Sequence, residues 1–200
     1  MTTPEFEVKP VFPVALLLHG RRCLLVGSGS ELTSRTRALL EARAKPVVVS
    51  TAAGDEIRDL AKRGEIELHE REFADSDLSD QWLAVLVDAD PTLAARMARL
   101  ADSARVFFCA VDQPEHNSYA HMARARAGLL TIAISTAGQA PALGRRLREE
   151  LERLLGQAKM APFVAELAEL RARTPSANRR AVLGAAVAAV RFTGVLELPR

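Results

Sequence analysis

The chain has 200 residues, of which 48% are hydrophobic and 26% charged, a composition typical of a folded globular protein rather than a disordered one. Its formal net charge is +2, from 27 basic and 25 acidic residues, which gives no concentrated positive charge for binding nucleic acid. No uncharged apolar run approaches the roughly 20 residues of a membrane helix, and the first residues lack the pattern of a signal peptide, so we expect a cytoplasmic protein with no membrane partner.

Short aliphatic runs alternate with amphipathic stretches over the first half of the chain. The runs predict strands at 22–26, 46–50, 66–68, 83–87 and 106–111, and the stretches predict helices at 30–43, 55–63 and 91–104. Apolar strands separated by such helices indicate an α/β fold, a Rossmann-like doubly wound parallel sheet covered on both faces, over residues 1–113. Cys23 and Cys109 lie in the apolar runs, so we expect buried thiols rather than a disulfide.

The pattern changes in the second half. Residues 129–135, LLTIAIS, alternate like a strand with one polar face, and a helix follows from Pro141 to about residue 155. Helices alone are predicted beyond about residue 160, at 161–173 and 179–190. We therefore expect a small strand-containing dimerisation and substrate section over 114–158 and a helical C-terminal domain over 159–200.

A glycine turn, GSGSE at 27–31, follows the first predicted strand and begins the first predicted helix. In a dinucleotide fold the first glycine permits a tight turn, the second lets the backbone approach the pyrophosphate, and N–H groups at the helix start bind phosphate. The third small residue of the usual pattern is replaced by Leu32, and Ser50 and Thr51 stand where an acid usually binds the ribose. A plain strand-to-helix turn is therefore the alternative to a nucleotide site.

Several segments resemble the precorrin-2 dehydrogenase/sirohydrochlorin ferrochelatase family, the N-terminal module of siroheme synthase. They are FPV and GRRCLLVG within 12–27, ALLEA at 38–42, REF at 71–73, WLA at 82–84, LTIAISTAG at 130–138, APAL at 140–143 and RRLREELE at 145–152. The resemblance covers about residues 10–155 and is most specific from residue 130 onwards.

The resemblance implies an NAD-dependent oxidation of precorrin-2 to sirohydrochlorin by a homodimer, in some members with insertion of ferrous iron. The family's key aspartate, in a motif resembling Asn-Val-Val-Asp, corresponds to Asp112 in CAVD at 109–112. The position also fits without the family, because a carboxylate just beyond a buried strand lies where open α/β sheets bind ligands and could act as a general base. A turn or helix-capping aspartate is the alternative.

The sequence departs from the family pattern on the cofactor side. The middle glycine of the turn is Ser28, the segment resembling Ala-Thr-Asp-Asp is VDAD at 87–90, and the following Asn is Ala94. Two hypotheses therefore stay open: an NAD-dependent dehydrogenase, or a non-catalytic tetrapyrrole- or partner-binding paralogue with a degenerate NAD site. The residues expected to hold NAD are Gly27, Ser28, Gly29, Ser30, Glu31, Thr51, Ala52 and Asp88.

Polar groups beyond Asp112 are weaker candidates. Ser135, Thr136 and Gly138 could hydrogen-bond substrate carboxylates, or they could cap the following helix. The arginines at 145, 146 and 148 could face an acidic substrate, or they could form i,i+4 pairs on a solvated helix. His116 and His121 could bind a transition metal, but histidines in a polar loop are more often solvated, and we predict no metal site.

Overall fold

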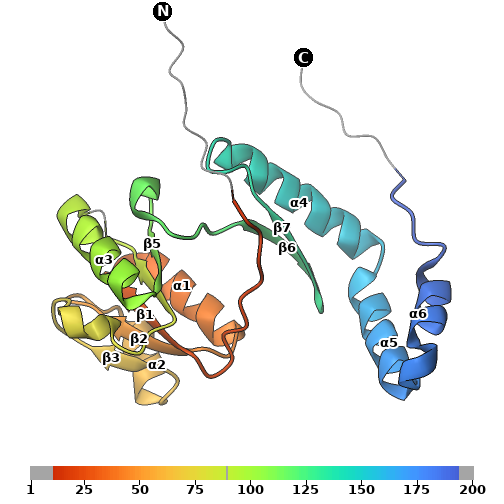
Figure 1. Cartoon of the computed structure of the whole chain (residues 1–200), viewed down its shortest axis with the longest axis horizontal. Coiled ribbons are helices and arrows are strands. Elements are labelled where there is room, and N and C mark those ends of the chain that lie inside the picture. The colour runs from red at the N-terminus through yellow and green to blue at the C-terminus, as the bar shows by residue number, and fades with distance from the viewer. Residues whose placement is uncertain (1–10, 89, 194–200) are drawn as a thin grey trace, which may run out of the picture. The chain divides into compact units, whose positions relative to one another are not determined.

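The computed structural model describes residues 11–88 and 90–193. These residues fall into two compact units, the first ending at His121 and the second beginning at Met122 (Figure 1). The finer boundaries predicted at residues 113 and 158 stay predictions.

The first unit contains a five-stranded parallel sheet of order β3-β2-β1-β4-β5. Its elements, in chain order, are β1 (Arg22–Val26), α1 (Gly29–Glu41), β2 (Lys45–Val49), α2 (Asp55–Lys62), β3 (Glu67–His69), the short 3-10 helix η1 (Asp75–Leu78), β4 (Leu83–Leu86), α3 (Pro91–Ala104), β5 (Phe107–Ala110) and the 3-10 helix η2 (Pro114–His116). The strand order reverses between β1 and β4, so the carboxyl ends of these strands form the switch point at which open α/β sheets bind ligands. The predicted Rossmann-like sheet is confirmed.

Both faces of this sheet are buried. On one face Leu25 of β1 belongs to a cluster with Leu32 of α1 and Ile57 of α2. On the other face Leu24 of β1 belongs to a cluster with Met97 of α3. Because side chains alternate along a strand, a strand covered on both sides needs apolar residues at every position, which is why the strands appear as continuous aliphatic runs in the sequence.

The two cysteines of this unit lie on β1 and β5 as free thiols. Cys23 and Cys109 are both buried and unpaired, as predicted. Burial disfavours the thiolate and raises the pKa of each thiol to about 11.

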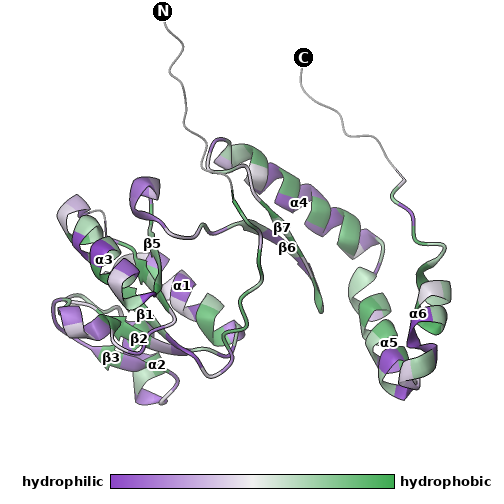
Figure 2. Cartoon of the chain, in the orientation of Figure 1, coloured by the Kyte–Doolittle hydropathy of each residue, from purple (hydrophilic) through white to green (hydrophobic). Residues whose placement is uncertain are grey.

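The second unit combines an antiparallel hairpin with helices. Its elements are β6 (Ala123–Ala127), β7 (Leu130–Ile134), α4 (Pro141–Gln157), α5 (Met160–Arg173), the 3-10 helix η3 (Ser176–Asn178) and α6 (Arg179–Val187). β7 corresponds to the predicted alternating strand, whereas β6, with the sequence ARARA, was not predicted. Ala125 and Ala127 of β6 are buried with Leu155 of α4, and α4 carries alternating hydrophobic and hydrophilic stripes (Figure 2).

The helices that follow α4 bury little. Neither α5 nor α6 contains a buried residue among those described, and the apolar side chains of Val182 and Val187 on α6 are exposed. No helix in the described ranges is long and apolar enough to cross a membrane.

Candidate cofactor and catalytic site

The glycine turn lies between β1 and α1 and presses against the end of β4. Gly27 has a φ of +128°, and a Cβ atom there would lie 2.5 Å from Val87 Cγ2 and 2.7 Å from Asp88 Oδ1, so only glycine fits without displacing the strand end. Gly29 has a φ of +80°, and a Cβ atom there would meet nothing within 4 Å. The backbone is therefore closed at the first glycine and open at the second, as close approach of a pyrophosphate requires.

Helix α1 begins with backbone N–H groups that no side chain caps. Ser28 is the N-cap residue, but its hydroxyl makes no capping hydrogen bond. The acid in the first turn, Glu31, is paired with Arg35 at 2.7 Å. The first-turn amides, which have no partner within a helix, therefore face open space with the positive end of the helix dipole behind them. These residues fit a dinucleotide pyrophosphate.

The end of β2 is neutral and fixed by local hydrogen bonds. Ser50 is buried, its N–H donates to the His69 carbonyl at 3.0 Å, and its hydroxyl accepts the N–H of Ala52 at 3.2 Å. Thr51 and Ala52 are exposed beyond it. This surface lies beside the glycine turn, because β1 and β2 are neighbours and Gly27 N–H donates to the Val49 carbonyl at 3.1 Å.

The arginines that follow β2 and β3 form ion pairs with carboxylates of this chain. Arg58 of α2 pairs with Glu70 at 2.8 Å. Arg71, just after β3, forms two hydrogen bonds with Asp77 at 2.6 and 2.8 Å, and this pairing lowers the pKa of Asp77. Neither guanidinium is left without an anionic partner.

Asp112 follows β5 at the same edge of the sheet. It has a left-handed φ of +61°, which is uncommon for a residue other than glycine, and the Gln113 N–H closes its turn by donating to the Ala110 carbonyl at 3.3 Å. The side chain is exposed, and no described residue forms a hydrogen bond or ion pair with its carboxylate. The N-cap of η2 is Gln113 and not Asp112, so the carboxylate caps no helix in the described structure.

Asp88 and Gln113 connect the glycine turn to the turn of Asp112. The Asp88 carboxylate accepts the Ser28 N–H at 3.2 Å, and the Asp88 carbonyl accepts the Gln113 side-chain amide at 3.4 Å. Gln113 is only 9% exposed, and no residue that the structure describes forms a hydrogen bond with its Oε1. Sequence analysis did not identify Gln113, because a glutamine in a polar loop carries no signal of burial.

The loop after η2 returns along β5 and covers the edge of the sheet. Asn117 Oδ1 accepts the Ala110 N–H at 2.6 Å, and the Ser118 hydroxyl accepts the Phe108 N–H at 2.8 Å. Within the described ranges, no group of His, Cys, Asp and Glu side chains could hold a metal ion.

Ser135, Thr136 and Gly138 belong to the second unit, in the turn between β7 and α4. The Ser135 hydroxyl accepts the Ala137 N–H at 3.1 Å, and the Thr136 hydroxyl accepts the N–H of Ala140, the N-cap residue of α4, at 3.2 Å. The hydroxyls therefore stabilise the turn, and each keeps its own hydrogen for donation to a ligand.

The arginines of α4 are paired with acids on the same helix. Arg146 pairs with Glu150 at 2.6 Å, and Arg148 pairs with Glu149 and Glu152 at 3.3 Å. These contacts correspond to the solvated-helix alternative.

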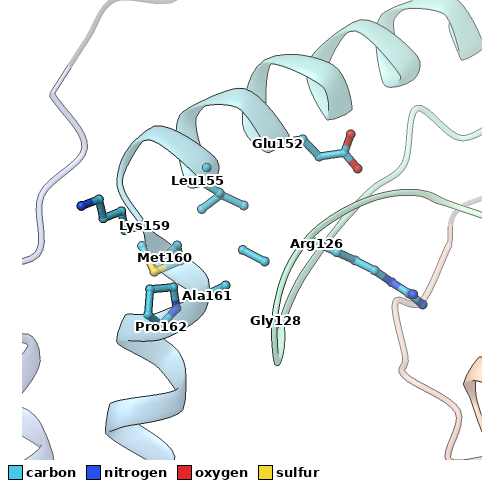
Figure 3. A pocket seen from close by; sticks show the side chains of 10 residues that line it. Arg126, Gly128, Glu152, Leu155, Lys159, Met160, Ala161 and Pro162 are labelled. Carbon is cyan, nitrogen blue, oxygen red and sulfur yellow. The ribbon is translucent and has the colours of Figure 1, made fainter.

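A cavity of about 460 Å³ lies in the second unit, between the end of the β6–β7 hairpin and the junction of α4 with α5 (Figure 3). Leu155, Met160 and Pro162 line it together with the charged residues Glu152 and Lys159. None of the predicted cofactor, catalytic or substrate residues lines this cavity.

Two protein families match parts of this chain. Residues 14–122 match the family described as putative NAD(P)-binding, and residues 128–154 match the central region of sirohaem biosynthesis proteins. The chain belongs to this NAD(P)-binding family. The family match supports a nicotinamide dinucleotide as the cofactor.

Relatives within this NAD(P)-binding family confirm the resemblance seen in the sequence. The chain is 36% identical over 157 residues to siroheme synthase 2 of Cronobacter sakazakii, covering 78% of this chain and 34% of that protein. It is 36% identical over 171 residues to siroheme synthase 3 of Aeromonas hydrophila, covering 84% of this chain and 36% of that protein. The chain thus spans about a third of the length of these curated relatives.

A solved structure of the same fold is named SirC, precorrin-2 dehydrogenase. It matches with a TM-score of 0.72 and 21% sequence identity, over 88% of this chain and 88% of that one. The NAD(P)-binding family member described here therefore shares that fold.

Proposed function

We propose that this protein is an NAD-dependent dehydrogenase that oxidises precorrin-2 to sirohydrochlorin in siroheme biosynthesis. One observation carries the proposal: an open, uncapped glycine turn and an unpaired carboxylate, Asp112, lie at the same edge of one parallel sheet. The similarity to siroheme synthases and to a precorrin-2 dehydrogenase supports the choice of substrate.

NAD rather than NADP is the cofactor that the surroundings of β2 favour. Residues 27–31 would hold the pyrophosphate, with Thr51 and Ala52 beneath the adenosine and Asp88 on the nicotinamide side. A 2′-phosphate usually needs a free arginine near the end of β2. Arg58 and Arg71 are paired with acids, which leaves no free guanidinium there for a second phosphate.

Asp112 is the proposed general base. Oxidation of precorrin-2 removes two electrons and two hydrogens, one as hydride and one as a proton, and yields sirohydrochlorin, NADH and H⁺. The bound nicotinamide supplies the hydride acceptor. The exposed Asp112 carboxylate, which has no hydrogen-bond or ion-pair partner in the described part of the chain, takes the proton. Where ferrous iron is inserted afterwards, it enters as a substrate, and the same carboxylate would accept the macrocycle N–H protons.

Ser135, Thr136 and Gly138 of the second unit are the proposed substrate-binding residues. Ser135 and Thr136 keep hydroxyl hydrogens, and Gly138 an N–H group, for the carboxylates of a tetrapyrrole. The apolar side chains of Val182 and Val187, left exposed on α6, favour a homodimer in which a second copy covers them. We also propose that the protein is cytoplasmic, as the sequence predicts.

A non-catalytic tetrapyrrole-binding paralogue is the second candidate. The observation that favours it is the Asp88 carboxylate, which occupies the Ser28 N–H and adds negative charge beside the phosphate site. Calorimetric titration with NAD and NADP distinguishes the candidates. We expect NAD to bind more tightly than NADP, whereas absence of NAD binding at millimolar concentration would leave only the paralogue.

A further inference from the structure

Gln113 holds an unusual position between the two halves of the candidate site. It is 9% exposed, its Nε2 donates to the Asp88 carbonyl at 3.4 Å, and its Oε1 has no hydrogen-bond partner among the described residues. A buried amide oxygen without a donor destabilises the folded state, so an apolar side chain of the same length would serve stability better. Stability alone therefore does not explain a glutamine here.

The contacts of Gln113 form a continuous path across the carboxyl edge of the sheet. At one end, the Asp88 carboxylate holds the Ser28 N–H of the glycine turn. At the other end, the Gln113 N–H closes the turn that keeps Asp112 at a left-handed φ of +61°. The side chain of Gln113 joins these ends, because it bridges from the Asp112 turn on β5 to the end of β4.

We propose that Gln113 is a positioning residue that fixes the Asp112 carboxylate relative to the cofactor turn. This inference rests on the proposed function, in which Asp112 takes the proton beside the nicotinamide. Gln113 does not touch the reacting atoms in this account. It fixes the position of the Asp112 carboxylate, and misplacement of a catalytic group by about 1 Å can lower the rate roughly 100-fold.

The first test needs neither cofactor nor substrate. Gln113→Met keeps the length of the side chain and removes both polar atoms. Gln81→Met is the matched control, since Gln81 is also buried with an unpartnered Oε1 but precedes the amino end of β4. By hydrogen–deuterium exchange, we expect faster exchange of the backbone amides of residues 111–113 in Gln113→Met and no change there in Gln81→Met. Unchanged exchange at 111–113 in Gln113→Met would overturn the proposal.

The second test separates positioning from cofactor binding. With precorrin-2 and NAD as substrates, Gln113→Met should lower kcat by roughly 10- to 100-fold. The KM for NAD should stay unchanged, and the melting temperature should stay unchanged or rise. Gln113→Asn, which keeps the amide but is one methylene too short, should show the same loss. A kcat equal to that of wild type, or a loss that appears only in the KM for NAD, would overturn the proposal. Absence of turnover in the wild-type protein would instead defeat the proposed function, and the exchange measurement would still decide whether Gln113 holds the turn.

Discussion

The backbone N–H of Ser28 donates to the carboxylate of Asp88 at 3.2 Å, across 60 residues of sequence. The contact fastens the second residue of the glycine turn to the end of β4, the strand next to β1 on the far side from β2. The turn thus takes its shape from both neighbours of β1, because Gly27 N–H also donates to the Val49 carbonyl of β2. A rigid turn of this kind presents the first amides of α1 in one orientation, which is what binding a pyrophosphate requires.

Gly29→Asp should abolish NAD binding while leaving the fold intact. The new carboxylate would project into the open space above the turn and repel the phosphates, and aspartate tolerates the left-handed backbone better than most residues. Gly64→Asp is the control, because Gly64 also has a positive φ of +72° and open space around it but follows α2. Calorimetry should show NAD binding to the Gly64 variant alone; binding to both would refute the site.

Gly27→Ala should damage the fold itself. A methyl group would lie 2.5 Å from Val87 Cγ2 and 2.7 Å from Asp88 Oδ1, so both side chains would have to move, and the φ of +128° strains any residue other than glycine. Overpacking of this kind costs about 1–3 kcal/mol of unfolding free energy. Urea denaturation should show the loss, and a variant as stable as wild type would mean that the turn is looser than the structure shows.

Asp112→Asn should lower precorrin-2 turnover by about 10²–10⁴-fold, the usual contribution of a positioned acid or base. Asparagine keeps the size of the side chain and tolerates the left-handed backbone, so the melting temperature and NAD affinity should hardly change. Asp80→Asn is the matched control, since Asp80 is also exposed with a φ of +60° but precedes β4. If Asp112 served only its turn, the variant would instead lose about 1 kcal/mol of stability and keep its turnover.

The two thiols should be unreactive in the native protein at pH 8. Burial raises the pKa of Cys23 and Cys109 from 9.0 to about 11, so almost no thiolate is present in the folded state. The same shift makes stability depend on pH: the folded state keeps its protons where the unfolded state loses them, so stability is full below pH 9 and falls as the pH rises towards 11. Alkylation followed by mass spectrometry checks the first statement, and rapid labelling of native protein at pH 8 would contradict it.

The sheet of the first unit could be predicted because burial on both faces gives its strands a recognisable local sequence pattern. Strands such as β2 are buried on both faces, and this demands an unbroken apolar run that the sequence shows directly. β6 has no such pattern: its buried positions are Ala125 and Ala127, a residue type depleted in strands, and arginines separate them. Only the pairing with β7 makes this segment a strand.

The candidate site was predictable in its residues but not in its contacts. Gly27 and Asp112 are marked by their places after strands, where open sheets bind ligands. The hydrogen bonds that Asp88 makes with Ser28 and Gln113 join segments that are distant in sequence, so no local sequence pattern predicts them. The burial of Gln113 likewise depends on how β4 and β5 end side by side.

The central claim is tested most directly by an anaerobic assay of the purified wild-type protein with precorrin-2 and NAD, in which NADH and sirohydrochlorin are measured together. The account predicts that both products appear at equal rates, one NADH for each sirohydrochlorin, with much slower formation when NADP replaces NAD. Precorrin-2 that remains unoxidised, with no NADH formed by a protein that is folded and supplied with NAD, would contradict it.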